Sequence, residues 1–278
     1  MYAIKLSRDS GRLAAQDVDL AASHGSGVMD PTGYRRRAAG EEPKVRPGAI
    51  ASSGVRLVTL SEHANLGALL RGAVGLVFVS EGQIEITLPN GRVVPLGRGT
   101  LLVIEDPKVD LFGAKHSAGT RLVHVGITEP LRQHPRETAV EAGGADEAPP
   151  NFQVMYRDKP GVDGVSYFRE FDQLFAGEAD EWSPTLPVIG VQLANIDQDA
   201  FIDWHPEVTN NLVLVTRGSL ELEVSGDNAV ETFRAGDIVL AADITGKGHI
   251  DRFAQSTSLV VPILEHSQLW APTAADVA

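Results

Sequence analysis

The sequence contains two copies of one pattern of short apolar runs, and this duplication limits the possible folds more than any other feature. GLVFVSEGQIEI at 75–86 matches NLVLVTRGSLEL at 211–222, and TLLVIEDP at 100–107 matches DIVLAADI at 237–244. Short apolar runs separated by Gly, Pro, Asn and Asp are typical of all-β sandwiches and barrels. We therefore predict an all-β chain of two tandem barrels with a few short helices.

Changes in composition along the chain predict where the barrels begin and end. Residues 1–50 are rich in Gly and show neither a helical nor a strand period clearly, which indicates irregular chain. Residues 129–150 contain prolines, a Gly pair and acidic residues, which are typical of a linker. The predicted units are an N-terminal irregular segment (1–50), a first barrel (51–128), a linker (129–150), a second barrel (151–268) and a tail (269–278).

Two local patterns predict smaller elements. Asn90-Gly91 favours a hairpin with a type I′ turn, because both central residues of that turn have positive φ angles. Aromatic residues at helical spacing over 167–175 predict a short helix that packs against a barrel.

Charge and cysteine content exclude some functions. With 37 acidic and 24 basic residues the net charge is −13, which disfavours binding to nucleic acid. No run approaches the ~18 apolar residues that cross a bilayer, so we expect no membrane partner. The chain has no cysteine, which excludes disulfides and thiolate chemistry and predicts a cytoplasmic location.

The second half resembles the cupin superfamily, whose small jelly-roll barrels (double-stranded β-helices) carry two motifs. The first motif has His, a second His, Glu and Gly at fixed spacing. In WHPEVTNNLVLVTRG (204–218), His205 stands at the first His, Glu207 at the second, and Asn211 at the Glu. The second motif runs from a Gly-Asp turn to a His, and AGDIVLAADITGKGH (235–249) supplies both, ending at His249.

This resemblance implies a ligand site inside the second barrel. His205, Glu207 and Asn211 share strand parity, so all three can point into the barrel, with His249 arriving from another strand. Two imidazoles and one carboxylate are a set that holds Fe(II), and Mn, Ni or Zn as well. We consider His205, Glu207 and His249 as the metal ligands. In the alternative, the same four residues bind an organic ligand without metal.

The first half fits the cupin pattern without its ligands. Counting back from Gly82 places Leu69, Arg71 and Gly75 at the ligand positions, and none can hold a metal as His or Glu does. This half also resembles the sugar-sensing barrels of AraC-type regulators. We expect a structural barrel or a metal-free pocket. His124 alternates with apolar residues and is expected in a core or pocket wall.

Three functions remain open at this point. The first is a bicupin that binds a small polar metabolite, with metal-dependent catalysis as an oxygenase, isomerase or lyase. The second is a non-catalytic sensor. The third is an assembly role. Leu212 and Leu214 are expected on the strand face opposite the barrel interior, so another surface should bury them, either the sister barrel or a second subunit in a homodimer. Trp204, opposite in parity to His205, is expected to face outward.

Overall fold

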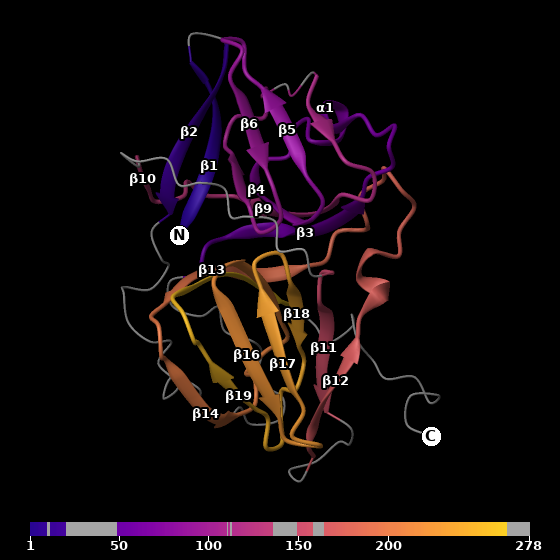
Figure 1. Cartoon of the computed structure of the whole chain (residues 1–278), viewed down its shortest axis with the longest axis vertical. Helices are drawn as coiled ribbons and strands as arrows, with labels where there is room; N and C mark the ends of the chain where they lie inside the picture. The colour runs from indigo at the N-terminus through magenta and orange to yellow at the C-terminus, as the bar shows by residue number, and fades with distance from the viewer. Residues whose placement is uncertain are drawn as a thin grey trace.

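The computed structural model describes residues 1–9, 12–20, 49–109, 111, 113–135, 149–157 and 164–265. These residues form two β-structures placed one above the other, the first half of the chain in indigo and magenta and the second in orange and yellow (Figure 1). Strands dominate both halves, and the single α-helix among the described residues spans only Leu66–Leu69 (α1). The predicted all-β class is confirmed.

The second half is a jelly roll of two antiparallel sheets. One sheet has the order β14-β19-β16-β17, and the other contains the run β18-β15-β20-β13. Apart from the β16–β17 hairpin, successive strands alternate between the two sheets, as in a jelly roll. The strands are β13 (Val188–Ile196), β14 (Phe201–His205), β15 (Asn211–Arg217), β16 (Ser219–Val224), β17 (Val230–Arg234), β18 (Ile238–Ala241), β19 (His249–Arg252) and β20 (Thr257–Leu264).

The first half repeats this order with one strand replaced. Its larger sheet contains the run β7-β4-β9-β3 and its smaller sheet is β6-β5-β8. The counterpart of β14 is not a strand: residues 60–74, all described, form turns and α1. The strands are β3 (Ser52–Thr59), β4 (Gly75–Glu81), β5 (Ile84–Thr87), β6 (Val93–Leu96), β7 (Leu101–Ile104), β8 (Lys115–His116) and β9 (Arg121–Ile127).

Each barrel is extended by a hairpin that precedes it in the chain. β1 (Tyr2–Asp9) and β2 (Arg12–Leu20) pair with each other, and β1 runs parallel to β7. In the same way β11 (Phe152–Arg157) pairs with β12 (Ser166–Glu170) and runs parallel to β18. The duplication therefore includes the hairpins.

Several boundaries predicted from the sequence need correction. The described part of 1–50 is not irregular, because β1 and β2 occupy most of its first twenty residues. Within the expected linker, β10 (Gln133–Pro135) pairs with β2. Residues 21–48 and 136–148 and the tail 269–278 lie outside the described residues.

Two local predictions are also corrected. The segment 167–175 is not a helix: it continues β12 to Glu170 and then makes a 3₁₀ turn over Asp172–Phe175. The β5–β6 hairpin forms, but of its central residues only Gly91 has a positive φ, 82°, so the turn is not type I′.

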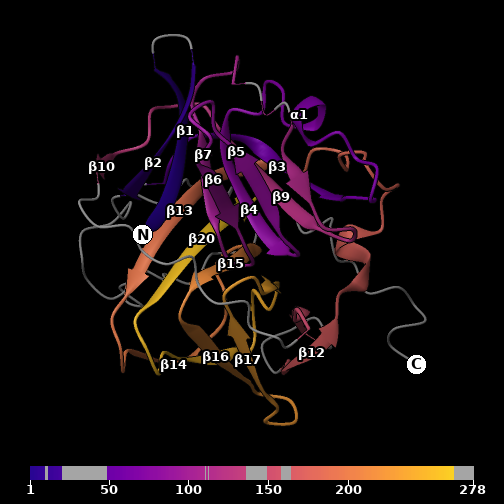
Figure 2. The ribbon, with the colours of Figure 1, turned by 45° about the horizontal axis from the view of Figure 1, so that its top comes forward.

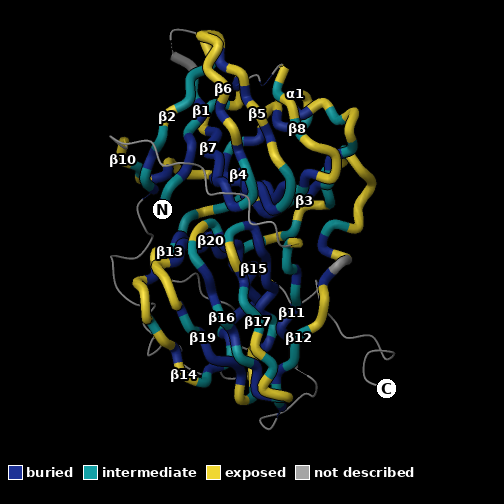
Figure 3. The backbone as a smooth tube through the Cα atoms, in the orientation of Figure 1, coloured by how far each residue is buried: buried dark blue, intermediate teal, exposed yellow. Residues whose placement is uncertain are grey.

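Three apolar cores result from the alternation of side chains along the strands. One fills the first barrel, one fills the second, and a third lies between the large sheets of the two halves. Leu212 and Leu214 of β15 are fully buried in this shared core, together with Leu76 and Phe78 of β4. The strands β13, β20 and β15 run beneath the first half (Figure 2), and buried backbone marks the junction (Figure 3). The sister barrel is thus the cover expected from the sequence.

Two glycine turns at equivalent places in the duplication meet at this junction. Arg98, before β7, forms a buried ion pair with Asp237, before β18. Asp237 also accepts hydrogen bonds from the backbone N–H groups of Asn151 and Arg234, and the Ser80 hydroxyl donates to the carbonyl of Gly236 at 2.9 Å. The Gly236-Asp237 turn therefore joins the barrels.

A further segment of the second half closes the first barrel. Residues 180–186 run along β3, with backbone hydrogen bonds from Ser183 to Leu57 and in both directions between Leu186 and Val55. From this segment Trp182 packs on the first barrel's core and donates its indole N–H to the carbonyl of Leu69 at 3.0 Å.

Within the described residues, no helix has both the length and the apolar character of a membrane span.

Candidate metal and ligand site

A β-bulge turns the first candidate, His205, into the second barrel. On the β14–β19 pair, Ile202 stands opposite Asp251 and His205 opposite His249, so two residues of β14 face Ile250 alone. A bulge inserts one residue and reverses the side-chain parity beyond it. For this reason both Ile202 and His205 point inward, although three positions separate them.

The bulge also fixes which nitrogen of the His205 ring faces the barrel. The carbonyl of Asp203 lies 2.9 Å from His205 Nδ1, and a carbonyl can only accept, so Nδ1 carries the proton. The Asp203 side chain accepts the N–H of Trp204 at 2.8 Å. His205 Nε2 lies 4.0 Å from a carboxylate oxygen of Asp251.

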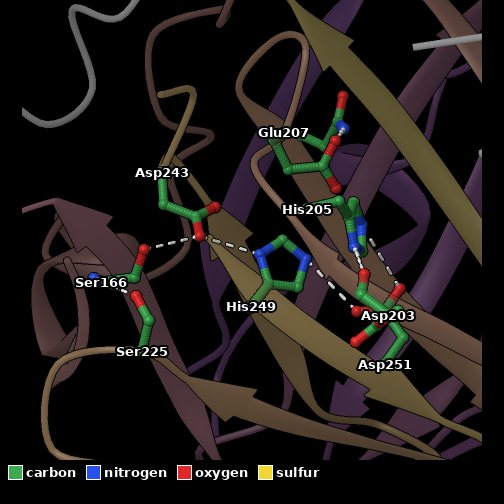
Figure 4. A network of polar contacts seen from close by, with 9 residues as sticks. Ser166, Asp203, His205, Glu207, Ser225, Asp243, His249 and Asp251 are labelled. Carbon is green, nitrogen blue, oxygen red and sulfur yellow. Dashed lines mark hydrogen bonds and ion pairs between the residues drawn. The ribbon is translucent and has the colours of Figure 1, made fainter. Parts of the chain in front are cut away.

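His249 lies between two buried carboxylates. Its Nδ1 donates to Asp243 Oδ2 at 2.8 Å, and its Nε2 is 3.2 Å from Asp251 Oδ1. The Ser166 hydroxyl holds the same Asp243 oxygen at 2.9 Å, and the Ser166 N–H donates to Ser225 (Figure 4). Burial by itself lowers the pKa of His249, but the charges and hydrogen bonds of Asp243 and Asp251 outweigh it and raise the pKa well above its ordinary value.

Asp251 is the site residue that the sequence reasoning missed. It follows His249 by two positions on β19, so both side chains project from the same face of the strand. His205, His249 and Asp251 bring ligand atoms to within 4.8 Å of one another. Strand parity in the sequence HID could have identified Asp251, had the search extended past the last motif histidine.

The other two candidates lie beside this cluster and contact each other. Asn211, at the start of β15, donates from Nδ2 to Glu207 Oε2 at 2.7 Å, and its Oδ1 accepts from the Thr209 hydroxyl at 3.1 Å. Glu207 and Asn211 are both buried, and both line the same cavity as His249 and Asp251. The structure thus brings all four predicted residues together, but groups Asp251 rather than Glu207 with the histidines.

The donor set matches what a divalent metal requires. Both histidines use Nδ1 in a hydrogen bond to the protein, which is how metal-binding histidines are usually oriented. Ligand atoms at ~2.1 Å from one ion lie about 3.0–3.4 Å apart. The 3.2 Å between His249 Nε2 and Asp251 Oδ1 falls in this range, and the 4.0 Å between His205 Nε2 and Asp251 Oδ2 lies beyond it. Asp251 Oδ1 is buried and pairs with His249, whose Nε2 would lose its proton when an ion binds. A cation between the three donors would use this oxygen.

The charge balance of the site also favours a cation. Three carboxyl side chains, those of Glu207, Asp243 and Asp251, are buried around two imidazoles. Buried carboxylates are costly unless positive charge compensates them. One protonated imidazole compensates one of the three, and a divalent ion supplies the larger charge that such a set requires.

The loop before β19 is held against β14 on both sides. Gly248 has φ 78°, and a Cβ there would lie 1.9 Å from the carbonyl oxygen of His205, so only glycine fits. Outside the barrel, the Lys247 ammonium lies 3.6 Å from the ring centroid of the half-buried Trp204, a cation–π contact. Trp204 therefore contacts the loop before β19.

A cavity of ≈ 30 Å³ adjoins the cluster inside the second barrel. This volume holds about two water molecules. Its polar end is formed by Glu207, Asn211, His249 and Asp251. The rest of its wall is apolar: Met155, Val213, Leu220, Leu222, Val239, Ala241, Phe253, Leu259 and Val261.

The first barrel carries no equivalent cluster among the described residues. Buried aliphatic side chains fill its interior, and Leu69 and Gly75, at the ligand positions, lie in α1 and β4. His124 is buried and accepts from Arg56 at Nδ1 while its Nε2 binds the carbonyl of Val74. Burial lowers its pKa to about 4, helped by Arg56 and opposed by the Val74 hydrogen bond, so it is a neutral core residue.

Comparison with known proteins gives distant likenesses only. No protein-family model matches the sequence, and no curated protein matches it. Among solved structures, a cupin 2 conserved barrel domain protein from Leptotrichia buccalis is 11% identical over 77% of this chain and 85% of its own, with a TM-score of 0.30. A putative glyoxylate-induced protein from Pseudomonas aeruginosa is 13% identical over 93% and 84%, also at 0.30. Oxalate decarboxylase from Bacillus subtilis is 13% identical over 80% and 68%, at 0.24.

We draw no conclusion about activity from scores this low. The strand order of this chain is itself informative, because both halves keep the jelly-roll arrangement, and the second brings His205 and His249 together beside its cavity. In its architecture the chain is a tandem of two jelly-roll barrels.

Proposed function

We propose that the second barrel binds one divalent metal ion through His205, His249 and Asp251 and holds a small molecule beside it. The observation that carries this proposal is the convergence of His205 Nε2, His249 Nε2 and the Asp251 carboxylate beside a cavity that His249 and Asp251 line, with both Nδ1 atoms already hydrogen-bonded to the protein. Two histidines and one carboxylate leave positions open for a ligand.

A bound metal would give this site catalytic capability, by polarising a carbonyl or activating water. The chain's own residues would orient the donors: Asp203 holds the ring of His205, and Asp243 with Ser166 holds the ring of His249. The apolar wall formed by Leu222, Phe253 and its neighbours would keep bulk water away. We propose metal-assisted catalysis on this basis, without a choice among oxygenase, isomerase and lyase.

Metal content measured on untagged protein tests the proposal. We expect about one equivalent of Fe, Mn, Ni or Zn in the wild type and its loss in His249→Ala. Asp251→Asn and Glu207→Gln form a matched pair, because each removes one carboxylate charge from the same cavity. Asp251→Asn should weaken binding strongly, whereas Glu207→Gln should retain the metal.

His116→Ala is the control outside the site, since this histidine hydrogen-bonds the carbonyls of Ala64 and Ser117 in the first barrel. Wild-type protein that stays metal-free after incubation with each ion would contradict the proposal. A metal lost in Glu207→Gln but kept in Asp251→Asn would restore the ligand set expected from the sequence.

We further propose that the protein is cytoplasmic and that it pairs as a homodimer. The cytoplasm accords with the lack of cysteine. Light scattering tests the dimer: a mass of 29.7 kDa would indicate a monomer.

A further inference from the structure

A contact on the outer surface of the second barrel joins the two strands that carry the histidines inside. Trp204 directly precedes His205 on β14. Lys247 lies just before β19, two residues ahead of His249, and its ammonium is 3.6 Å from the centroid of the Trp204 ring. We propose that Lys247 and Trp204, here called the outer clamp, are positioning residues that hold His205 against His249 for a metal ion. The inference deepens the proposed function and rests on it.

The strand that carries His205 is held on one side only. β14 is the edge strand in the sheet order β14-β19-β16-β17 and lies at the margin of the second barrel in Figure 1. The bulge interrupts its pairing after Ile202, and beyond the bulge His205 and His249 are the one registered pair in the described part of the chain. His205 is also the last residue of β14. Strand ends open more readily than strand centres, so a restraint outside the ladder determines how firmly His205 is held.

The hydrogen bonds inside the barrel orient each histidine ring separately. The ring centroids of His205 and His249 lie 4.4 Å apart, with the ring planes tilted by 53°. His205 Nδ1 bonds to the carbonyl of Asp203, which belongs to the same strand, and His249 Nδ1 bonds to Asp243, which belongs to the loop before β19. Neither bond connects β14 with the segment that carries His249. The outer clamp makes this connection.

The backbone before β19 brings Lys247 to the Trp204 ring. Gly248 passes so close to the carbonyl of His205 that a Cβ would not fit, which places the loop directly against the end of β14. The backbone N–H of Lys247 donates to the carbonyl of Gly164 at 3.2 Å, which anchors the loop to the segment before β12. Lys247 has no ion pair with any described residue, so no carboxylate draws its ammonium away from the ring.

The sign of the effect separates the outer clamp from a simple charge effect. A positive charge near a cation site repels the ion, so its loss alone should strengthen metal binding or leave it unchanged. The outer clamp predicts the opposite. An exposed cation–π contact changes an equilibrium constant about two- to fivefold, so losing it should weaken metal binding by about that factor.

The first measurement is the Zn²⁺ affinity, obtained by competition with a chromophoric chelator. Lys247→Met keeps the length of the side chain and removes its charge, and it should bind Zn²⁺ about two- to fivefold more weakly than the wild type. Lys247→Arg retains a cation that stacks on the ring and should bind as the wild type does. Trp204→Leu should also weaken binding, and the double variant with Lys247→Met should lose no more than Trp204→Leu alone, because the two residues act through one contact.

Arg252→Met is the matched control for charge. It also removes a positive side chain from the outer face of β19, but Arg252 pairs with Glu221 and Glu223 of β16 and does not hold β14. Its loss should not weaken Zn²⁺ binding.

The second measurement needs no metal. Backbone hydrogen exchange in the metal-free protein, followed in peptides that cover residues 201–205, reports how often the end of β14 opens. We expect exchange there to be about two- to fivefold faster in Lys247→Met than in the wild type, and unchanged in Lys247→Arg and Arg252→Met.

Exchange at 201–205 that is as slow in Lys247→Met as in the wild type would overturn the inference, whether or not the protein takes up metal. Zn²⁺ binding that is equal or tighter in this variant would overturn it as well. If the protein takes up no metal but 201–205 exchange faster in Lys247→Met, the metal proposal fails and the hold of the outer clamp on His205 is supported. If metal binds and exchange does not change, the proposed function stands and the outer clamp fails.

Discussion

Metal binding should release a proton from His249. Its pKa lies well above 6.5 because Asp243 and Asp251 outweigh the effect of burial. The imidazolium must lose the Nε2 proton before that nitrogen can bind an ion, while Nδ1 keeps the proton that it donates to Asp243. At pH 6.5, one bound ion should therefore displace about one proton.

The magnitude follows from this exchange. Each pH unit below the raised pKa lowers the apparent metal affinity about tenfold, or ~1.4 kcal/mol. Calorimetric titration of Zn²⁺ at pH 6.5, in two buffers with different ionisation enthalpies, gives the number of protons released. Asp243→Asn removes the charge that contributes most to the raised pKa of His249, so the number of protons released should fall while the metal affinity drops ~10–100-fold.

If the wild type releases almost no protons on binding metal at pH 6.5, the reasoning is refuted, since His249 would already be neutral.

The same linkage predicts how the stability of the protein depends on pH. A histidine whose folded pKa is raised stabilises the metal-free protein fully below its unfolded pKa, near 6.5, and this contribution is lost as the pH rises through the folded pKa. The metal-bound protein should not show this loss.

Three further predictions concern the scaffold. Arg98→Ala leaves Asp237 buried without its counter-charge, and urea denaturation should show a loss of ~3–5 kcal/mol; an unchanged stability would contradict this. Gly248→Ala should lower both stability and metal affinity, because its Cβ would meet the β14 backbone, while Gly91→Ala, at a similar φ of 82° with open space around it, should lower stability alone. Trp182→Ala should destabilise the first barrel by ~3–5 kcal/mol in thermal unfolding and leave metal content unchanged; a loss of metal would show that the two barrels are coupled more closely than their packing indicates.

The sequence was most informative where the alternation of side chains along a strand is compatible with one structure only. The repeated apolar runs predicted two barrels, and the motif spacing selected Glu207, Asn211 and His249, which line one cavity, although Glu207 lies in the loop between β14 and β15 rather than on a strand. Leu212 and Leu214 predicted a covered sheet face, and the shared core covers it. These inferences depend on side-chain alternation, which is local and regular.

What the sequence could not predict depends on irregular backbone. Parity alone puts Ile202 and His205 on opposite faces, and the bulge between them, which follows from the pairing with β19, reverses this. In the first half, the replacement of the counterpart of β14 by α1 and turns likewise depends on tertiary structure and not on a local sequence pattern. The aromatic spacing over 167–175 indicated a helix, but pairing of β12 with β11 overrode it.

The shared core has a practical consequence for dissecting this protein. Either half expressed alone would expose a sheet of Leu, Val and Phe side chains to solvent and should be prone to aggregation. A truncated second barrel that fails to bind metal would thus say nothing about its ligands. The first barrel covers the apolar sheet of the second, and point substitutions in the intact chain are the way to separate their roles.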